Sequence, residues 1–255
     1  MSSYGDGALT PRRLVLVFCR SPRDESRVKP LAARSRPQAE RLHRALLERA
    51  LAAAAETGAD VRLVTTPAVD DMRALAARYV PAARLEVTLQ RGDSFGARLE
   101  AAVRDAFADG YGPIALLGGD TADLTGAHLA GAFAALDRGA GAVVGPARDG
   151  GYYLLALAAF TRAPFDGVAL QTSATFAATV AALAATGLDV ATLSPLRDVD
   201  DAEGVVALAR FGSAPERRAA LALLSALVAP LARLALPRLL ASAVTHEARG
   251  PPILR

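Results

Sequence analysis

The sequence contains no tryptophan, one cysteine (Cys19) and one lysine (Lys29), and aromatic residues make up only 5% of its 255 positions. A single cysteine excludes a disulfide within the chain and also excludes a cysteine-rich metal site. Because apolar residues nonetheless reach 52%, the core has to be built mainly from alanine, leucine and valine. We therefore expect a cytoplasmic protein with an aliphatic core.

A strong excess of charge is also absent, since 29 basic and 26 acidic residues leave a formal net charge of +3. Surfaces that bind nucleic acid usually concentrate their basic residues in one stripe, whereas these are spread along the chain. Residues 219–236 form an apolar stretch, but Pro230 and Arg233 interrupt it, and a central arginine is costly in lipid. We expect neither a nucleic-acid partner nor a membrane span.

Short β-branched runs alternate with longer segments rich in alanine and leucine. The expected strands are 13–18, 60–66, 84–90, 113–119, 141–146, 152–157 and 188–193. The expected helices are 37–57, a segment ending near Tyr79, 95–108, 126–139 and 173–187. This alternation predicts an α/β fold, a Rossmann-like three-layer α/β/α sandwich with a mostly parallel central sheet and helices on both faces.

The expected organisation is one large domain with two extensions. Residues 1–12 are predicted to be a disordered lead-in, 13–212 the domain, and 213–255 a helical C-terminal appendage. Pro230 and Pro237 divide the appendage into short helices, because proline ends a helix. We expect these helices to pack on the domain or to form a homodimer.

The loop after the first expected strand is dense in basic residues. Ligands of open α/β sheets bind beyond the carboxyl ends of the strands, and arginine and lysine supply charged donors to phosphate. The loop is therefore a candidate polyphosphate site, with a flexible, solvated loop as the alternative. Its basic residues are Arg20, Arg23, Arg27, Lys29, Arg34 and Arg36.

Acidic residues follow two other strands. Asp120 comes directly after an apolar run and Gly118-Gly119, and Gly119 allows a ligand to approach the backbone closely. Mg²⁺ is typically held by one or two carboxylates together with substrate phosphates. We therefore predict Asp120 as a metal ligand rather than a helix cap, and Asp123 as the cap of the helix that begins near Thr125.

The last strand is followed by three acids, Asp198, Asp200 and Asp201. Clustered carboxylates repel one another unless a positive charge lies nearby. Asp200 is the predicted second metal ligand, with a solvated turn as the alternative, and Asp201 is the predicted cap of the next helix.

Two glycine-bearing segments complete the candidate site. Gly92 and Gly96 flank a helix start that can accept an anion, and Arg98 lies in its first turn. In the second segment, Asp149-Gly150 is typical of a hairpin turn.

The rest of that second segment exceeds what a turn requires. Gly150 and Gly151 are expected to keep the wall thin beside a bound acceptor, and Asp149 to bind acceptor hydroxyls or act as a base. Tyr152 and Tyr153 should face opposite sides of the sheet. We therefore expect at most one of them, Tyr152, to line the site.

Five stretches together resemble an uncharacterised bacterial family of glycosyltransferase-like proteins in the GT-A, or nucleotide-diphospho-sugar transferase, superfamily. They are 28–36, 90–102, "GGDTADLTGAHLAGAFAAL" (118–136), "VVGPARDGGYYLLAL" (143–157) and 193–208. More distant cousins are the guanylyltransferases of molybdenum-cofactor assembly and the phospholactate guanylyltransferases of deazaflavin-cofactor assembly.

The resemblance implies a nucleotide held by the first half of the sheet, with Mg²⁺ or Mn²⁺ bridging its phosphates through Asp120 and Asp200. Lys29 matches a basic residue of the family that faces phosphate, and the segment containing Gly92, Gly96 and Arg98 matches another family stretch.

The chain departs from the family pattern at several positions. The Thr-Arg-Leu that follows the lysine in the family is replaced here by residues 30–32, so that Arg34 is the expected substitute for the missing arginine. Ala122 stands where the family commonly has proline, and Gln171 where it has tryptophan.

The expected function is a metal-dependent transferase that takes a nucleotide sugar and a small-molecule acceptor. Nucleotidyl transfer from a nucleoside triphosphate to a phosphorylated small molecule is the alternative, and the basic loop favours it because a triphosphate needs more positive neighbours. A non-catalytic nucleotide-binding or assembly protein is the alternative of another class.

Overall fold

The computed structural model describes residues 12–31, 33, 35–199, 202–211, 214, 217, 218, 220–222 and 224. The predicted lead-in, apart from Arg12, and nearly all of the predicted appendage lie outside these residues. So do two predicted site residues, Arg34 and Asp200.

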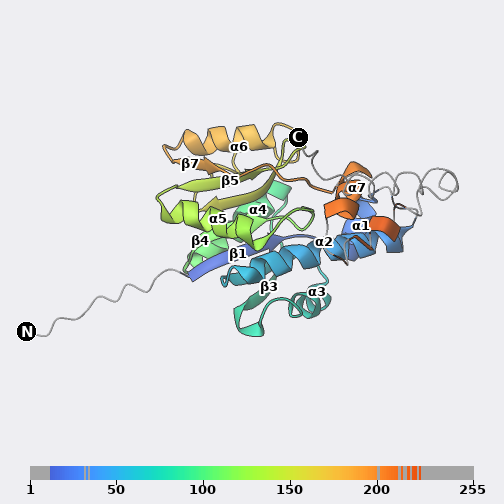
Figure 1. Cartoon of the computed structure of the whole chain (residues 1–255). Helices are drawn as coiled ribbons and strands as arrows, with labels where there is room; N and C mark the ends of the chain where they lie inside the picture. Colours follow the sequence, from blue (N-terminus) through green and yellow to red (C-terminus); the bar gives the residue numbers. More distant parts are fainter. Residues whose placement is uncertain are drawn as a thin grey trace, which may run out of the picture.

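Within the described residues, seven strands form one sheet in the order β3-β2-β1-β4-β6-β5-β7 (Figure 1). Strand β6 runs antiparallel to both of its neighbours, β4 and β5, and all other neighbouring strands are parallel. The strands are β1 Arg12–Phe18, β2 Asp60–Thr65, β3 Leu85–Leu89, β4 Tyr111–Leu117, β5 Ala142–Pro146, β6 Tyr152–Leu157 and β7 Val190–Thr192.

Helices cover both faces of the sheet. Core residues of α2, α3 and α5 pack on one face, and those of α4 and α6 pack on the other. The helices are α1 Pro22–Val28, α2 Arg36–Glu56, α3 Val69–Ala76, α4 Phe95–Ala108, α5 Gly126–Asp137, α6 Thr175–Ala184 and α7 Ala202–Phe211, with a 3₁₀ turn at Ala82–Arg84. The predicted three-layer α/β/α fold is confirmed.

Strand β1 illustrates why this sequence forms a covered sheet. Val15 and Val17 face the layer of α2, whereas Leu14 and Leu16 face the layer of α4, and each is at most 1% exposed. A strand buried on both faces carries a continuous apolar run rather than an alternating one. The core therefore consists of two layers of side chains, one on each face of the β-sheet.

The segment after the first strand was expected to be a loop, but its residues 22–28 form helix α1, so the alternative of a flexible, solvated loop is wrong there. Ser21 caps the helix, because its hydroxyl accepts a hydrogen bond from the backbone N–H of Asp24 at 3.1 Å, and Pro22 occupies the first helical position. Both features are typical of a helix start. The helix places its last residues and Lys29 beside the loop that follows β4.

Helix α5 begins at Gly126, as predicted, but its N-cap is Thr125 and not Asp123. The backbone N–H of Thr125 donates to Nδ1 of His128 at 3.2 Å, so Thr125 and His128 together form the cap. Asp123 is therefore not the cap.

Helices α1 and α7 lie together at one end of the sheet, on the right in Figure 1. Val205 and Leu208 of α7 pack with Leu42 and Leu46 of α2. No helix in the described part of the chain is both long and apolar enough to cross a membrane, and the apolar stretch 219–236 lies mostly outside that part.

Candidate active site

A cavity of about 610 Å³ opens where β1 and β4 end. Phe18 and Cys19 at the end of β1, Leu117 and Gly118 at the end of β4, and Tyr152 at the start of the antiparallel β6 all contribute to its wall. This is the edge of the sheet where ligands of open α/β folds bind. Its charged lining residues are Arg20, Glu25, Lys29, Asp120, Asp149 and Asp198.

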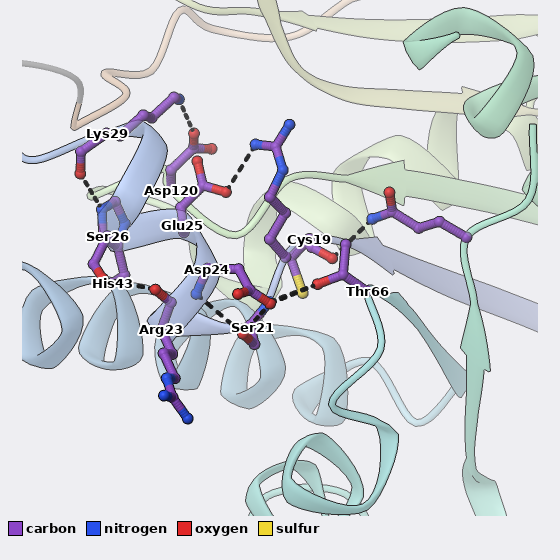
Figure 2. Close-up of polar contacts among 12 residues, drawn as sticks. Cys19, Ser21, Arg23, Asp24, Glu25, Ser26, Lys29, His43, Thr66 and Asp120 are labelled. Atoms are coloured by element: carbon purple, nitrogen blue, oxygen red, sulfur yellow. Dashed lines mark hydrogen bonds and ion pairs between the residues drawn. The ribbon is translucent and has the colours of Figure 1, made fainter. Parts of the chain in front are cut away.

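Lys29 and Asp120 form an ion pair across the cavity wall. Nζ of Lys29 donates to Oδ2 of Asp120 at 2.8 Å, and the two side chains are 34% and 29% exposed. Figure 2 shows the lysine reaching over from the end of α1 to the aspartate. Two residues that are 91 positions apart in the chain are thus brought together at the site.

The backbone of Lys29 is held from two sides. Its N–H donates to the carbonyl of Glu25 at 2.8 Å, and its carbonyl lies 2.8 Å from Nε2 of His43. His43 is only 4% exposed on α2, and burial lowers its pKa, which favours the neutral ring. Because a carbonyl can only accept, Nε2 carries the proton. His43 was not among the predicted site residues.

The end of β1 is fixed by Gln90, which follows β3. Its Nε2 donates to the carbonyl of Cys19 at 2.8 Å, and its backbone N–H donates to the carbonyl of Thr65 at 2.8 Å. Burial raises the pKa of the Cys19 thiol well above its ordinary value. Cys19 is therefore a neutral wall residue rather than a thiolate nucleophile.

The other basic residues of the predicted polyphosphate loop are arranged differently. Arg20 lines the cavity and pairs with Glu25 at 3.1 Å. Arg27 pairs with Asp24 at 2.9 Å on the surface, and the side chain of Arg23 points away from Asp120 (Figure 2). Of the described basic residues of this loop, Arg20 and Lys29 line the cavity.

A second carboxylate, Asp198, stands beside the Asp120 loop. Thr121 donates from Oγ1 to Oδ1 of Asp198 at 2.8 Å, and the N–H of Val199 donates to the carbonyl of Asp120 at 3.0 Å. These contacts tie the two loops together. The prediction chose Asp200 from the same acidic run; Asp198 is the member of that run that the described structure places on the cavity wall.

The wall fits a divalent cation bound together with phosphate. Among the residues that the structure describes, no three His, Cys, Asp or Glu side chains gather as a self-sufficient metal site. Mg²⁺ needs no such group, since it usually takes one or two carboxylates and fills its other positions with water and substrate phosphate. Asp120 and Asp198 supply carboxylate oxygens of this kind.

The turn between β5 and β6 forms another part of the wall, with Asp149 and Gly151 lining the cavity. Oδ1 of Asp149 accepts from the N–H of Gly151 at 2.9 Å. Gly150 instead faces the start of α6: its φ is +93°, its carbonyl accepts from the N–H of Phe176 at 2.8 Å, and a Cβ there would lie 2.0 Å from the carbonyl oxygen of Ser173. Gly150 thus fixes the turn against residues 173–176.

Tyr152 and Tyr153 face opposite layers, as predicted, but both contribute to the cavity wall. The expectation that at most one lines the site is wrong, because the cavity lies at the edge of the sheet and reaches both faces. Burial raises the pKa of both phenols, that of Tyr153 to about 12. Both are therefore neutral, and Tyr153 donates to the carbonyl of Ser194 at 3.2 Å.

Gly92, Gly96 and Arg98 lie outside the cavity lining, although Gln90, Phe95 and Leu99 of the same stretch belong to it; Gly119 also lies in the lining. A Cβ at Gly92 would lie 2.9 Å from the backbone N of Arg98, and one at Gly96 would lie 3.2 Å from the side chain of Leu170. Nη1 of Arg98 faces the carbonyl of Gly92 at 3.4 Å. In this structure the two glycines allow close packing around the start of α4.

Several solved structures are similar to this chain. One from Desulfovibrio desulfuricans G20, provisionally assigned as a nucleotide-diphospho-sugar transferase, is 26% identical with a TM-score of 0.73, over 87% of this chain and 98% of that one. A cytidylyltransferase from Leptospira borgpetersenii is 13% identical with a TM-score of 0.49, over 81% and 90%.

A third similar structure is the 4-diphosphocytidyl-2C-methyl-D-erythritol synthase of Anaerococcus prevotii, 9% identical with a TM-score of 0.48, over 84% of this chain and 96% of that one. No curated protein matches the chain. The family model described as "Uncharacterized protein conserved in bacteria (DUF2064)" matches residues 42–172. Because this match spans more than half of the sequence, the chain belongs to the DUF2064 family, as its resemblance to a bacterial GT-A-type family predicted.

Proposed function

We propose that the protein is a transferase that acts on a nucleotide-activated substrate, with Mg²⁺ or Mn²⁺ held by Asp120 and Asp198. The observation that carries the proposal is the convergence of both carboxylates with Lys29 in one cavity at the carboxyl ends of β1 and β4. Asp200, which lies outside the described residues, stays a predicted ligand.

The charge of the cavity supports the participation of a cation. Among the residues that the structure describes, its lining holds two basic side chains, Arg20 and Lys29, and four acidic ones, Glu25, Asp120, Asp149 and Asp198, which gives a formal balance of −2. His43 adds no charge, because burial lowers its pKa. A polyphosphate entering without a cation would meet net repulsion. Bound beside Asp120, the cation would neutralise charge that develops on the leaving phosphate.

Glycosyl transfer from a nucleotide sugar is the leading reaction. The Desulfovibrio desulfuricans protein carries the corresponding assignment. The basic loop favours a triphosphate less than its sequence predicts, because Arg23 and Arg27 do not line the cavity. In this reaction the acceptor oxygen bonds to the anomeric carbon, the bond from that carbon to the phosphate oxygen breaks, and a nucleoside diphosphate leaves.

The chain's own residues divide between the two substrates. Arg20 and Lys29 provide donors for the phosphates, and they line the same cavity as the turn that contains Asp149 and Gly151. Asp149 receives the proton of the acceptor hydroxyl as the new bond forms, and Gly151 and Tyr152 border the acceptor.

Nucleotidyl transfer is the second candidate, favoured by the presence of two basic side chains, Arg20 and Lys29, in the cavity lining. Here an acceptor phosphate oxygen bonds to the α-phosphorus of a nucleoside triphosphate, and the bond from that phosphorus to the bridging oxygen breaks. Pyrophosphate leaves.

A panel of nucleoside triphosphates and nucleotide sugars, each with Mg²⁺ or Mn²⁺, separates the candidates by thermal shift, because a ligand that binds the folded state raises the melting temperature. We expect a shift with nucleotide sugars in the presence of the metal. A shift with triphosphates alone would leave nucleotidyl transfer, and no shift with any nucleotide would overturn both enzymatic proposals.

Asp120→Asn tests the metal ligand. We expect loss of metal-dependent nucleotide binding, while the free energy of unfolding changes by less than about 1 kcal/mol, because the ion pair to Lys29 is partly exposed. Isothermal titration with and without Mn²⁺ measures the first effect and urea unfolding the second. Unchanged metal dependence in the folded variant would return Asp120 to a turn role.

A further inference from the structure

The single lysine of the chain is paired with the carboxylate to which the metal is assigned. We propose that Lys29 competes with the metal ion for Asp120, and that metal binding releases its ammonium group to the phosphates of the nucleotide. The inference rests on the proposed function, because it takes Asp120 as the metal ligand. Its consequence is that metal and nucleotide bind cooperatively.

The geometry of the pair sets up the competition. The Lys29 ammonium donates to Oδ2 of Asp120 at 2.8 Å, so the carboxylate already has a positive partner. A cation that binds there has to displace that partner or share the oxygen with it at the cost of repulsion. The two side chains are 34% and 29% exposed, and pairs that water reaches are weak enough to exchange.

The lysine is anchored at its backbone and movable at its tip. Its N–H donates to Glu25, its carbonyl accepts from His43, and the buried ring of His43 belongs to the long helix α2. The four-carbon stem beyond this anchor is flexible. An ammonium group displaced from Asp120 therefore stays within the cavity, where Lys29 is a lining residue.

Metal and polyphosphate each bind at a free-energy cost when alone, and each ligand removes the cost of the other, so their binding is cooperative. A metal ion alone has to break the Lys29–Asp120 pair, and no phosphate is present to accept the ammonium. A polyphosphate alone meets a lining in which, among the described residues, acidic side chains outnumber basic ones by two to one. When both bind, the phosphates receive the ammonium group and the metal offsets the acids, which amounts to a coupling free energy between the two ligands.

Direct binding of Mn²⁺ alone, followed by the paramagnetic resonance signal of the free ion, tests the competition without any activity assay. We expect Lys29→Met to bind Mn²⁺ roughly tenfold more tightly than the wild type, because a nearby positive charge is removed and Asp120 is released. Lys29→Gln is the second neutral variant. Lys29→Arg, which keeps the charge, should stay within about threefold of the wild type.

Arg20→Met is the matched control. Arg20 lines the same cavity, but its partner is Glu25 rather than Asp120, so the variant removes one positive charge and leaves the Lys29–Asp120 pair in place. We expect its Mn²⁺ affinity to rise less than about threefold, because a charge farther from the ion is screened by water. Equal affinities of folded Lys29→Met and Arg20→Met for Mn²⁺ would overturn the competition.

Inorganic tripolyphosphate, which carries no base or sugar, tests the transfer of the ammonium group. Titration calorimetry should show that Mn²⁺ tightens its binding to the wild type by more than about tenfold, and by less in Lys29→Met, as expected for coupling of ordinary size. Equal tightening in the two proteins would overturn the release to phosphate.

The two proposals fail in different ways. If Lys29→Met gains Mn²⁺ affinity but neither the nucleotide panel nor tripolyphosphate binds, the transferase proposal is overturned and the competition at Asp120 stands. If nucleotides bind with the metal but Lys29→Met and Arg20→Met behave alike, the competition is overturned and the transferase proposal stands.

Discussion

The two walls of the cavity are built by different means. The charged wall is defined by Arg20, Lys29 and Asp120. Side-chain contacts hold it, and one of them, the ion pair of Lys29 with Asp120, joins residues that are far apart in the sequence. The turn wall, defined by residues 149–152, is held mainly by backbone contacts: the carbonyl of Gly150 accepts from the N–H of Phe176, and Gly150 packs closely against Ser173.

The difference has consequences for what each wall tolerates. Every charge named in the charged wall has a partner that remains partly exposed, so a substitution there should change binding more than stability. In the turn wall, Gly150 has a positive φ and no room for a Cβ, so a change there should alter stability first. The walls can therefore be separated by measuring unfolding and binding on the same variants.

Gly150→Ala is expected to have the largest effect on stability. The added methyl group would lie 2.0 Å from the carbonyl oxygen of Ser173, at a φ of +93°. Backbone strain and overpacking should together lower the free energy of unfolding by about 3 kcal/mol, measured by urea denaturation. Gly139→Ala is the control, because its φ is +105° with no atom near the added group; it should cost about 1 to 2 kcal/mol. Equal losses would mean that the contact with Ser173 is unimportant.

His43→Gln probes how the charged wall is supported and has an intermediate expected effect. Glutamine can still donate to the carbonyl of Lys29, so the loss at pH 7.5 should be about 1 to 2 kcal/mol, from packing. The pH dependence is more specific. Burial lowers the pKa of His43 below the ordinary 6.5, so as the pH falls through 6.5 the unfolded chain binds a proton that the folded protein does not.

The sign of that effect follows from linkage. Protonation of the unfolded chain favours unfolding, so the contribution of His43 to stability is present above pH 6.5 and is lost as the pH falls below it. Urea unfolding at pH 7.5 and 5.5 should therefore show a smaller decrease for His43→Gln than for the wild type. Identical decreases would mean that His43 titrates normally in the folded protein.

Much of the fold was predictable because long elements carry strong local signals. The helix predicted at 95–108 coincides with α4, where Ser94 provides the cap and apolar residues recur at helical spacing. Helix α1 was missed because its seven residues, PRDESRV, have no apolar period. In the structure the helix is recognised by the hydrogen bonds of Ser21 at its start and of Lys29 at its end. In the sequence, Ser21-Pro22 was the one signal that could have predicted a helix start here.

The candidate site was predictable as a place but not as a set of contacts. Asp120 and Lys29 were both expected at strand ends, yet no local pattern joins residues 91 positions apart. His43 was missed because a single histidine on the apolar face of a helix is usually interpreted as a residue of the core. Asp198 could not be chosen from the acidic run, since its place depends on the bridge to Thr121.

Asp149→Asn is expected to change stability least, and it sharpens the comparison from the side of the turn. The amide Oδ1 of asparagine can still accept from the N–H of Gly151, as the carboxylate does at 2.9 Å, so the free energy of unfolding should stay within about 0.5 kcal/mol. The amide cannot take up a proton. If Asp149 is the base, the turnover of a nucleotide and acceptor pair identified by the panel should fall about 100-fold or more, with nucleotide binding retained. Full turnover in Asp149→Asn would leave the turn wall with a structural role alone, and the base would then have to come from the charged wall.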